Sequence, residues 1–388
     1  MTDQRVETSI PCPPGYRYQL GKAAFNFEII TKSPNFIKYS DYARCHGLVR
    51  DICDDTLQPD NPTLPVDKYL NVVQKSDTWF TLRARADATA SSVGKKIKGP
   101  TMYPTIEQVS QHWEDMLLSK PFETTHTMRG HMKWGVDYED PALIHFAVEN
   151  GLSVAQVGTI YVPLSYIIDL RESYDLPELT PYLGMGNYSI QSMADHGAHL
   201  LVSPDGLVGL PDEGEYSELP EQLVGMLEIK CISPFHHVEN SDETLSWVDN
   251  MERRQWASPR GIPFVYIVQI CMQAMSGLYR LNMTREHTMW FMRWSPIGFS
   301  EFKIAFEPLV RMGVVATVLY FQLKQRIQSL DDLPLEYTPV EWELYELLHR
   351  EYINITNVMT HRYVAHETLY PEFSTYRKVT EHFHFVVD

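Results

Sequence analysis

Two neighbouring stretches decide the fold, HLLVSPDGLVGL at residues 199–210 and LVGMLEIKCI at residues 223–232. Both are rich in Leu, Val and Ile and have the length of a strand, so the sequence predicts two half-buried β-strands. The turn-rich acidic segment PDEGEYSELPEQ (211–222) separates them. We therefore expect a long hairpin in which the two strands lie side by side.

Three charged residues interrupt these apolar strands: Asp205, Glu228 and Lys230. Successive strand side chains point to opposite faces, so Glu228 and Lys230 share one face while Ile229 points into the core. An isolated Glu-x-Lys pair is more often a surface ion pair, and Asp-Gly is a common turn signal. Charges in an apolar strand, however, need partners or a metal. With Asp205 beside Glu228 across the hairpin, the carboxylates suit Mg²⁺, which takes further ligands from water and substrate phosphate.

The rest of the chain alternates between helical and extended patterns. Apolar residues at helical spacing predict helices at about 104–119, 138–150, 263–279, 308–330 and 339–357. Strands are expected in SVAQVGTIYV (153–162), TMWFMRWSP (288–296) and FSEFKIAFEP (299–308). Helices that flank a nearly continuous set of strands indicate an α/β core.

The composition limits the class of protein. The 388 residues contain 33 Lys+Arg and 50 Asp+Glu, and a net charge of −17 argues against a surface that attracts nucleic acid as a whole. The first residues, MTDQRVETSIPCPPGYRY, lack an apolar signal-peptide core, which predicts an intracellular, non-secreted protein. The longest uncharged run, 261–279, contains Pro and Gln, so we expect a buried element and no membrane span.

Two basic segments stand out against this acidic background. From Arg83 to Lys98, five Lys and Arg residues oppose only Asp87. The segment ERRQWASPR (252–260) interleaves Trp with Arg, a pattern that suits single-stranded nucleic acid and equally a solvated loop. We therefore expect nucleic acid to bind locally, through a few Lys and Arg side chains.

Five segments between Trp79 and Gln273 resemble, in order, the motifs of the PD-(D/E)XK nuclease superfamily. The likeness is closest to its YqaJ or phage lambda exonuclease branch, which includes viral alkaline nucleases. The segments are SDTWFTLRARADATASSVG with Trp79, Arg83 and Thr89-Ala90-Ser91; KWGVDYEDPA with Gly135, Glu139 and Ala142; SPDGLV (203–208); LEIKC (227–231); and IVQICMQAMSG with Gln269 and Gln273.

The resemblance implies a restriction-endonuclease-like α/β core, with a mixed central β-sheet flanked by helices and with extensions at both ends. We expect residues 1–75 to form an irregular, helix-poor N-terminal arm and linker. Residues 76–310 would form the nuclease core, and residues 311–388 a C-terminal helical extension and tail packed on it.

The resemblance also implies roles for the charged residues. Asp205, Glu228, the backbone carbonyl of Ile229 and Glu139 would hold one or two Mg²⁺ or Mn²⁺ ions. Lys230 would orient the attacking water, or deprotonate it if the pKa of the lysine is depressed. Either Gln269 or Gln273 would hydrogen-bond the lysine or the water network.

A second set of residues resembles a pocket for a terminal 5′ phosphate. Arg83 would bind phosphate oxygens and Ser91 would add a hydroxyl donor, while Trp79 would stack near the terminal nucleotide. The stretch between Arg83 and Ser91 is one residue longer than the family pattern, so Arg85 is the alternative phosphate ligand.

Together these features predict a metal-dependent deoxyribonuclease, a 5′-to-3′ exonuclease on duplex DNA ends in viral or phage-type replication and recombination. The family implies a single-strand annealing protein as partner, and the residues leave open whether the chain forms a homo-oligomer. One alternative is an endonuclease, or a nuclease that also cuts RNA, with the same site. The other is a catalytically inactive nucleic-acid-binding protein, which would not need the intact acidic cluster.

Overall fold

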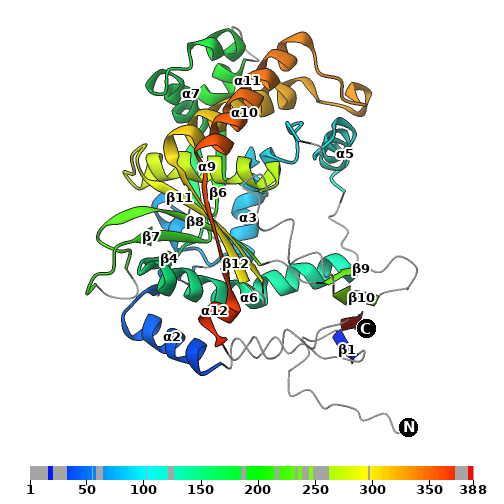
Figure 1. Cartoon of the computed structure of the whole chain (residues 1–388). Helices are drawn as coiled ribbons and strands as arrows, with labels where there is room; N and C mark the ends of the chain where they lie inside the picture. Colours follow the sequence, from blue (N-terminus) through cyan, green and yellow to red (C-terminus); the bar gives the residue numbers. More distant parts are fainter. Residues whose placement is uncertain are drawn as a thin grey trace.

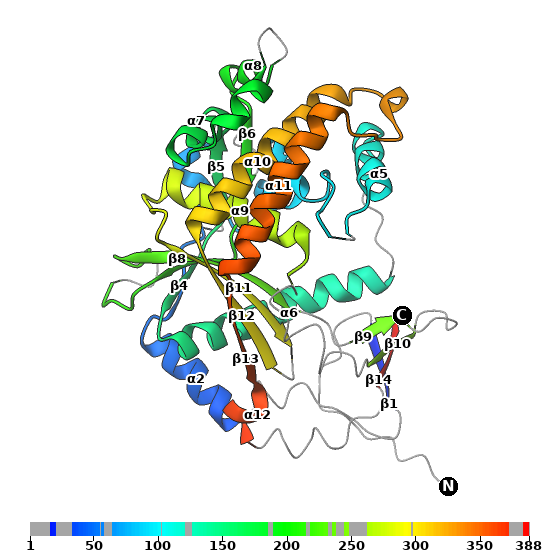
Figure 2. The same cartoon turned by 45° about the horizontal axis from the view of Figure 1, so that its top comes forward.

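The computed structural model describes residues 16–20, 33–54, 56–57, 64–101, 103–120, 126–184, 189–214, 218–231, 235–237, 244–247, 262–295, 298–371 and 383–387. A central sheet separates helix α6 (His126–Asn150) from helix α9 (Phe264–Arg280), as Figures 1 and 2 show. Helices α10 (Phe306–Arg326) and α11 (Pro339–Val358) lie beyond α9. This arrangement is the α/β class predicted from the sequence.

The central sheet is mixed and has seven strands in the order β13-β12-β11-β8-β7-β4-β2. The pairs β8–β11 and β2–β4 are parallel, and the other neighbours are antiparallel. The strands are β2 (Val49–Asp51), β4 (Ser153–Gln156), β7 (Gly206–Gly209), β8 (Leu223–Cys231), β11 (Thr288–Ser295), β12 (Gly298–Ala305) and β13 (Thr360–Ala365). The mixed sheet with helices on both faces is consistent with a PD-(D/E)XK-like nuclease fold.

Two smaller sheets accompany the central one. One has the order β3-β6-β5, and the other β1-β14-β10-β9. Their strands are β1 (Tyr16–Leu20), β3 (Ala88–Thr89), β5 (Ile160–Pro163), β6 (His199–Val202), β9 (Phe235–His237), β10 (Thr244–Trp247) and β14 (Phe383–Val387). The stretch 199–210 thus forms two strands in different sheets, because Ser203-Pro204-Asp205 separates them. The stretch 153–162 is divided in the same way.

Strand β8 shows how the two faces of the sheet are built. Met226 packs in one hydrophobic core with apolar residues of α9 and α10. Leu227 and Ile229 belong to a second core, which includes Leu143 and Phe146 of α6. Since side chains alternate along a strand, β8 is buried between both helix layers, and Ile229 points into the core as predicted.

All five predicted helices are present. Helix α5 (Ile106–Leu117) begins at a capping box between Thr105 and Gln108 and buries Val109 and Trp113. Helix α6 begins at His126, well before the expected start at 138, and continues through Pro141. The other helices are η1 (Val66–Asn71), α3 (Asp77–Arg85), α4 (Ala90–Val93), α7 (Leu164–Ser173), η2 (Pro177–Leu183), α8 (Ile190–Asp195), η5 (Leu330–Asp332) and α12 (His366–Leu369).

Part of the N-terminal arm is more regular than the sequence predicts. Helix α2 (Pro34–Cys45) is capped by Ser33 and buries Phe36 and Ala43 in the same core as α6. The strand β2 that follows pairs with β4 at the edge of the central sheet. The expectation of a helix-poor arm was therefore wrong for this stretch, where Ser-Pro is a helix start signal. The division into three parts at 75 and 310 remains a prediction.

Helix α10 has the length and hydropathy of a membrane span, and 78% of its most apolar window is buried within the protein. Its buried side chains belong to the core that contains α9. Burial of this kind is what a central core helix requires.

Candidate active site

The end of the β7–β8 hairpin brings the first two carboxylates together. Gly206 pairs with Leu227, so Asp205 lies opposite Glu228 just beyond the last pair. The backbone N–H of Ile229 donates to Oδ2 of Asp205 at 2.6 Å. A Cβ atom on Gly206 would lie 2.4 Å from Val154, so glycine is required by the close approach of β4.

Glu228 is fully buried and receives hydrogen bonds from three side chains. The ammonium of Lys230 donates to its Oε1. Two amides of α9 bind the same carboxylate, Gln269 to Oε1 at 2.6 Å and Gln273 to Oε2 at 2.5 Å. The structure therefore brings together Glu228, Lys230 and both glutamines, whereas the sequence left the choice between Gln269 and Gln273 open.

The charged groups in this cluster shift each other's pKa values. Burial and the neighbouring Glu228 raise the pKa of Asp205 well above its usual value, and the charge of Glu139 adds to this effect. Burial opposes the charge of Lys230, but Glu228 and Asp205 outweigh it and raise the pKa of this lysine. The raised pKa keeps Lys230 an ammonium ion, and its Nζ lies over the Tyr266 ring, 5.2 Å from the ring centroid. The charges of Glu228 and Asp205 thus work against the role of base, which requires a depressed pKa.

Glu139 approaches the same cluster from the opposite face of the sheet. It lies on α6, whereas the glutamines lie on α9. Its carboxylate is paired with Lys75, whose Nζ is 3.0 Å from Oε2 of Glu139. Asp205 thus interacts with two carboxylates, Glu228 on strand β8 and Glu139 on helix α6.

The oxygen atoms of this cluster fit a hard divalent cation by their chemistry. Burial and crowding of carboxylates favour the neutral form of Asp205, and a bound cation is what stabilises the charged form. Gln273 Oε1, beside Glu228, is a buried acceptor without a hydrogen bond in the described residues. Within the described residues, no three His, Cys, Asp or Glu side chains lie at the spacing of metal ligands. The predicted ligands Asp205, Glu228 and Glu139, with the carbonyl of Ile229, would therefore have to draw closer together to hold the ion.

A second cluster contains the residues predicted to bind a terminal phosphate. Arg83 on α3 donates to Oγ of Ser91 at 3.0 Å, and its guanidinium lies 4.2 Å from the centroid of the Trp79 ring. Burial lowers the pKa of Arg83 to about 10, which leaves it charged at neutral pH. Arg85 is exposed, so the structure favours Arg83 over Arg85 as the partner of Ser91.

The two clusters are joined through Ser203. The indole N–H of Trp79 donates to Oγ of Ser203 at 3.0 Å. Ser203 lies two residues before Asp205, and its carbonyl accepts a hydrogen bond from Gln273 at 3.4 Å. The Arg83 cluster and the carboxylate cluster therefore meet at one short stretch of backbone.

The basic segment that follows α3 is only partly available to a ligand. Lys96 lies against Met116 and Trp113, and Lys98 donates to the hydroxyl of Tyr345 at 2.8 Å. Lys95 is exposed and close enough to Arg83 for the charges to interact. The second basic segment, 252–260, lies outside the described residues.

Three residues near the site have no role assigned by the motifs. Ser203 stands in the quoted SPDGLV segment without an assigned role. Gln74 and Lys75 precede the Trp79 motif, and Gln74 donates to the carbonyls of Val157 and Pro204, each at 2.8 Å. Only the position of these residues next to known motifs could have pointed to them.

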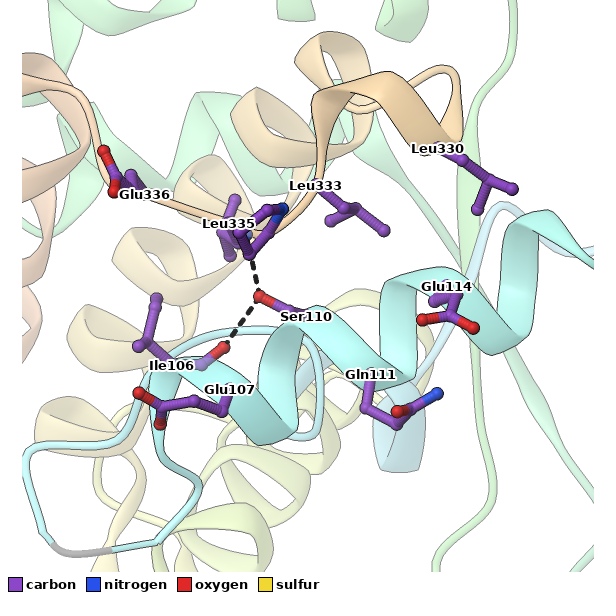
Figure 3. Close-up of a pocket in the computed structure, with 10 residues that line it drawn as sticks. Ile106, Glu107, Ser110, Gln111, Glu114, Leu330, Leu333, Leu335 and Glu336 are labelled. Carbon is purple, nitrogen blue, oxygen red and sulfur yellow. Dashed lines mark hydrogen bonds between the residues drawn. The ribbon is translucent and has the colours of Figure 1, made fainter.

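A separate cavity of about 630 Å³ lies between α5 and residues 330–336, as Figure 3 shows. Ser110 joins its two walls, accepting from the N–H of Leu335 at 2.8 Å. Its lining includes three glutamates and, within the described part of the chain, no Lys or Arg: Glu107, Glu114 and Glu336. Carboxylates at the rim of this cavity disfavour a phosphate ligand.

Comparison with known proteins agrees with this geometry. Residues 78–277, just over half of the chain, match the family described as YqaJ-like viral recombinase domain. The match spans all five motifs, from Trp79 to Gln273. No curated protein and no solved structure shows a significant match. The family is nuclease-like and has a phage-type recombination role with DNA as the implied substrate. The chain therefore belongs to the YqaJ-like viral recombinase family, as its motifs predict.

Proposed function

We propose that this protein is a metal-dependent exodeoxyribonuclease that hydrolyses duplex DNA from 5′ ends. The observation that carries the proposal is the hydrogen bond from Trp79 to Ser203 at 3.0 Å. It joins a pocket suited to a terminal phosphate to the carboxylate cluster that begins two residues later. An enzyme that cuts next to an end needs a phosphate site at a short, fixed distance from its catalytic groups.

The residues of the cluster would have different roles in hydrolysis. A divalent cation on the carboxylates would activate a water molecule and stabilise the charges of the phosphodiester as it is cleaved. Lys230, as an ammonium ion, would orient that water and offset the charge on the scissile phosphate. Gln269 and Gln273 hold the buried carboxylate of Glu228 in a single orientation. Products would be 5′-mononucleotides and a 3′ single strand.

The phosphate pocket sets which end is engaged. Arg83 presents its guanidinium between the Trp79 ring and Ser91, where it would bind a 5′ phosphate, while the indole would stack on the terminal nucleotide. We also propose that the protein acts inside a host cell, where its substrate would be viral or phage-type DNA. A single-strand annealing protein would be the partner that receives the 3′ strand.

The test uses end-labelled linear duplex DNA, closed circular DNA and RNA, each with Mg²⁺, with Mn²⁺ and with a chelator. We expect release of labelled 5′-mononucleotides from the linear duplex only, and only with metal. Rapid cutting of the circle would show an endonuclease, and equal cutting of RNA a broader nuclease. Binding of DNA without cleavage under any of these conditions would support an inactive nucleic-acid-binding protein.

A further inference from the structure

Lys75 is a cation at the edge of the carboxylate cluster that the family motifs do not include. Its Nζ lies 3.0 Å from Oε2 of Glu139, and 47% of its side chain is exposed. Its charge also reaches the thiol of Cys231, which directly follows Lys230 on β8. Lys75 therefore lies where the cluster opens to solvent, while Lys230 lies beside α9.

The backbone of Lys75 adopts a conformation that favours glycine. Its φ is 66°, in the left-handed region. The N–H of Ser76 donates to the carbonyl of Val73 at 3.3 Å and closes a four-residue turn, in which Lys75 is the third residue. This position of a turn commonly takes Gly or Asn, and other residues are strained there. Strained residues occur at sites where the side chain has a function, and the turn by itself does not call for a lysine.

The turn is fixed between the two clusters of the site. The side chain of Gln74 donates to the carbonyls of Val157 and Pro204, each at 2.8 Å, and Pro204 directly precedes Asp205. On its other side, Ser76 caps α3 by accepting the N–H of Trp79 at 3.2 Å. Lys75 is thus held next to the carboxylates at the start of the helix that carries the phosphate pocket.

Another anion can readily replace Glu139 as the partner of Lys75. Ion pairs between partly exposed side chains are weak because water screens both charges. A phosphate oxygen accepts hydrogen bonds from an ammonium group as a carboxylate does. A cation on Glu139 would also compete with Lys75 for the same oxygen, and an arriving DNA strand offers the lysine a new anionic partner.

We propose that Lys75 exchanges Glu139 for a backbone phosphate of bound DNA, on the strand that runs from the Arg83 pocket to Asp205. This inference rests on the proposed function and adds a substrate-binding residue to it. Lys75 would guide the strand between the two clusters, and its contribution would be to binding of DNA more than to the chemical step.

The experiment compares Lys75→Gly and Lys75→Gln with the wild type. Glycine keeps the left-handed backbone, and glutamine keeps a polar side chain, so the two separate the charge from the turn. Lys120→Gln is the matched control, because Lys120 is 44% exposed and pairs with Glu114 at 2.7 Å on the distant helix α5. Thermal unfolding of each variant shows that it is folded, and we expect Lys75→Gly to be at least as stable as the wild type.

The readout is the affinity for a 5′-phosphorylated duplex, measured by fluorescence anisotropy with Ca²⁺ over a series of salt concentrations. A gel at the end checks that the DNA is intact. Loss of one phosphate contact should lower the slope of log K against log [salt] by about 0.7 to 0.9. We expect this change in both Lys75 variants and no change in Lys120→Gln. With Mg²⁺, KM should rise more than kcat falls.

An unchanged salt slope in both Lys75 variants would overturn the inference. So would a change in the Mg²⁺ concentration needed for cleavage without any effect on the slope, because Lys75 would then act only as the counterion of Glu139. Failure of the proposed function looks different: the wild type itself would neither bind nor cleave duplex ends. If the wild type is active and the Lys75 variants bind DNA as the wild type does, the proposed function stands and only the role of Lys75 is refuted.

Discussion

Ile229 donates its backbone N–H to Oδ2 of Asp205 at 2.6 Å, beyond the last backbone pair of β7 and β8. The side chain of Asp205 thus completes the hydrogen bonding of a strand amide that β7 no longer reaches. This bond orients the carboxylate and leaves Oδ1 without a hydrogen bond in the described residues. One oxygen therefore binds the backbone, and in the proposed function the other would bind the cation.

Asp205→Asn should separate activity from stability. We expect cleavage to fall by at least about 100-fold, because an amide is a poor substitute for a metal-binding carboxylate. The midpoint of thermal unfolding should stay the same or rise, since burial and Glu228 disfavour the charge of Asp205 in the fold. Initial rates and thermal unfolding, measured on the same preparation, check both. A midpoint several degrees lower would mean that the carboxylate is mainly structural.

Replacement of Lys230 should distinguish a cation from a base. Because Glu228 and Asp205 raise its pKa against the effect of burial, Lys230 keeps its charge at neutral and moderately alkaline pH. Lys230→Arg should therefore retain at least about tenfold more activity than Lys230→Gln, the difference of one charge-assisted hydrogen bond. Rates of both variants across this pH range are the measurement. Equal loss in the two variants, with a wild-type rate that follows a single deprotonation, would favour the base.

Arg83→Ala should remove the preference for a phosphorylated end. We expect the wild type to degrade 5′-phosphorylated duplexes faster than 5′-hydroxyl duplexes by about 10- to 150-fold, the value of one charged hydrogen-bonded contact. In Arg83→Ala the two rates should become similar. Arg85→Ala is the control, because the exposed Arg85 should leave the preference intact. Exchange of these two results would assign the phosphate to Arg85.

Acid should destabilise the fold through His145. Trp294 donates its indole N–H to Nδ1 of His145 at 3.0 Å, so Nε2 carries the proton that lies toward the hydroxyl of Tyr370. Burial, with the charge of His366, lowers the pKa of His145 well below its usual 6.5. As pH falls below 6.5, the unfolded chain takes up a proton that the folded protein does not.

From about pH 7.5 to about pH 5.5 this difference should remove about 1.4 kcal/mol from the free energy of unfolding. The His145→Phe variant should be less stable at the higher pH, because Trp294 loses its acceptor, but should lose about 1.4 kcal/mol less on acidification. Denaturant unfolding of both proteins at the two pH values provides the measurement. An identical pH dependence in wild type and variant would contradict the assignment.

Much of the candidate site was predictable from the sequence because it depends on local rules. The alternation of side chains on a strand placed Glu228 and Lys230 together and Ile229 in the core. The apolar pattern predicted α5 to within two residues at each end. Helix α6 was harder, since Pro141 normally ends a helix, whereas here the helix continues and packs against the sheet and α2.

Other features were set by segments that are distant along the chain. No local pattern distinguishes Gln269 from Gln273, and both bind Glu228 because α9 runs along the β8 face. Likewise, nothing in the residues around Arg83 and Arg85 decides which guanidinium meets Ser91. The tertiary structure decides it, because Arg83 is half-buried and donates to Ser91, whereas Arg85 is exposed.

The sequence by itself determined the family, the order of the motifs and the pairing of carboxylates with a lysine on adjoining strands, because these depend on residue type and on strand periodicity. Only the tertiary structure decided how the charges are shared. It places Glu139 on the opposite helix layer, ties Trp79 to Ser203 and sets Lys75 beside the cluster. Electrostatic and hydrogen-bonding distances between segments depend on packing of the whole domain, and no short stretch of sequence encodes them.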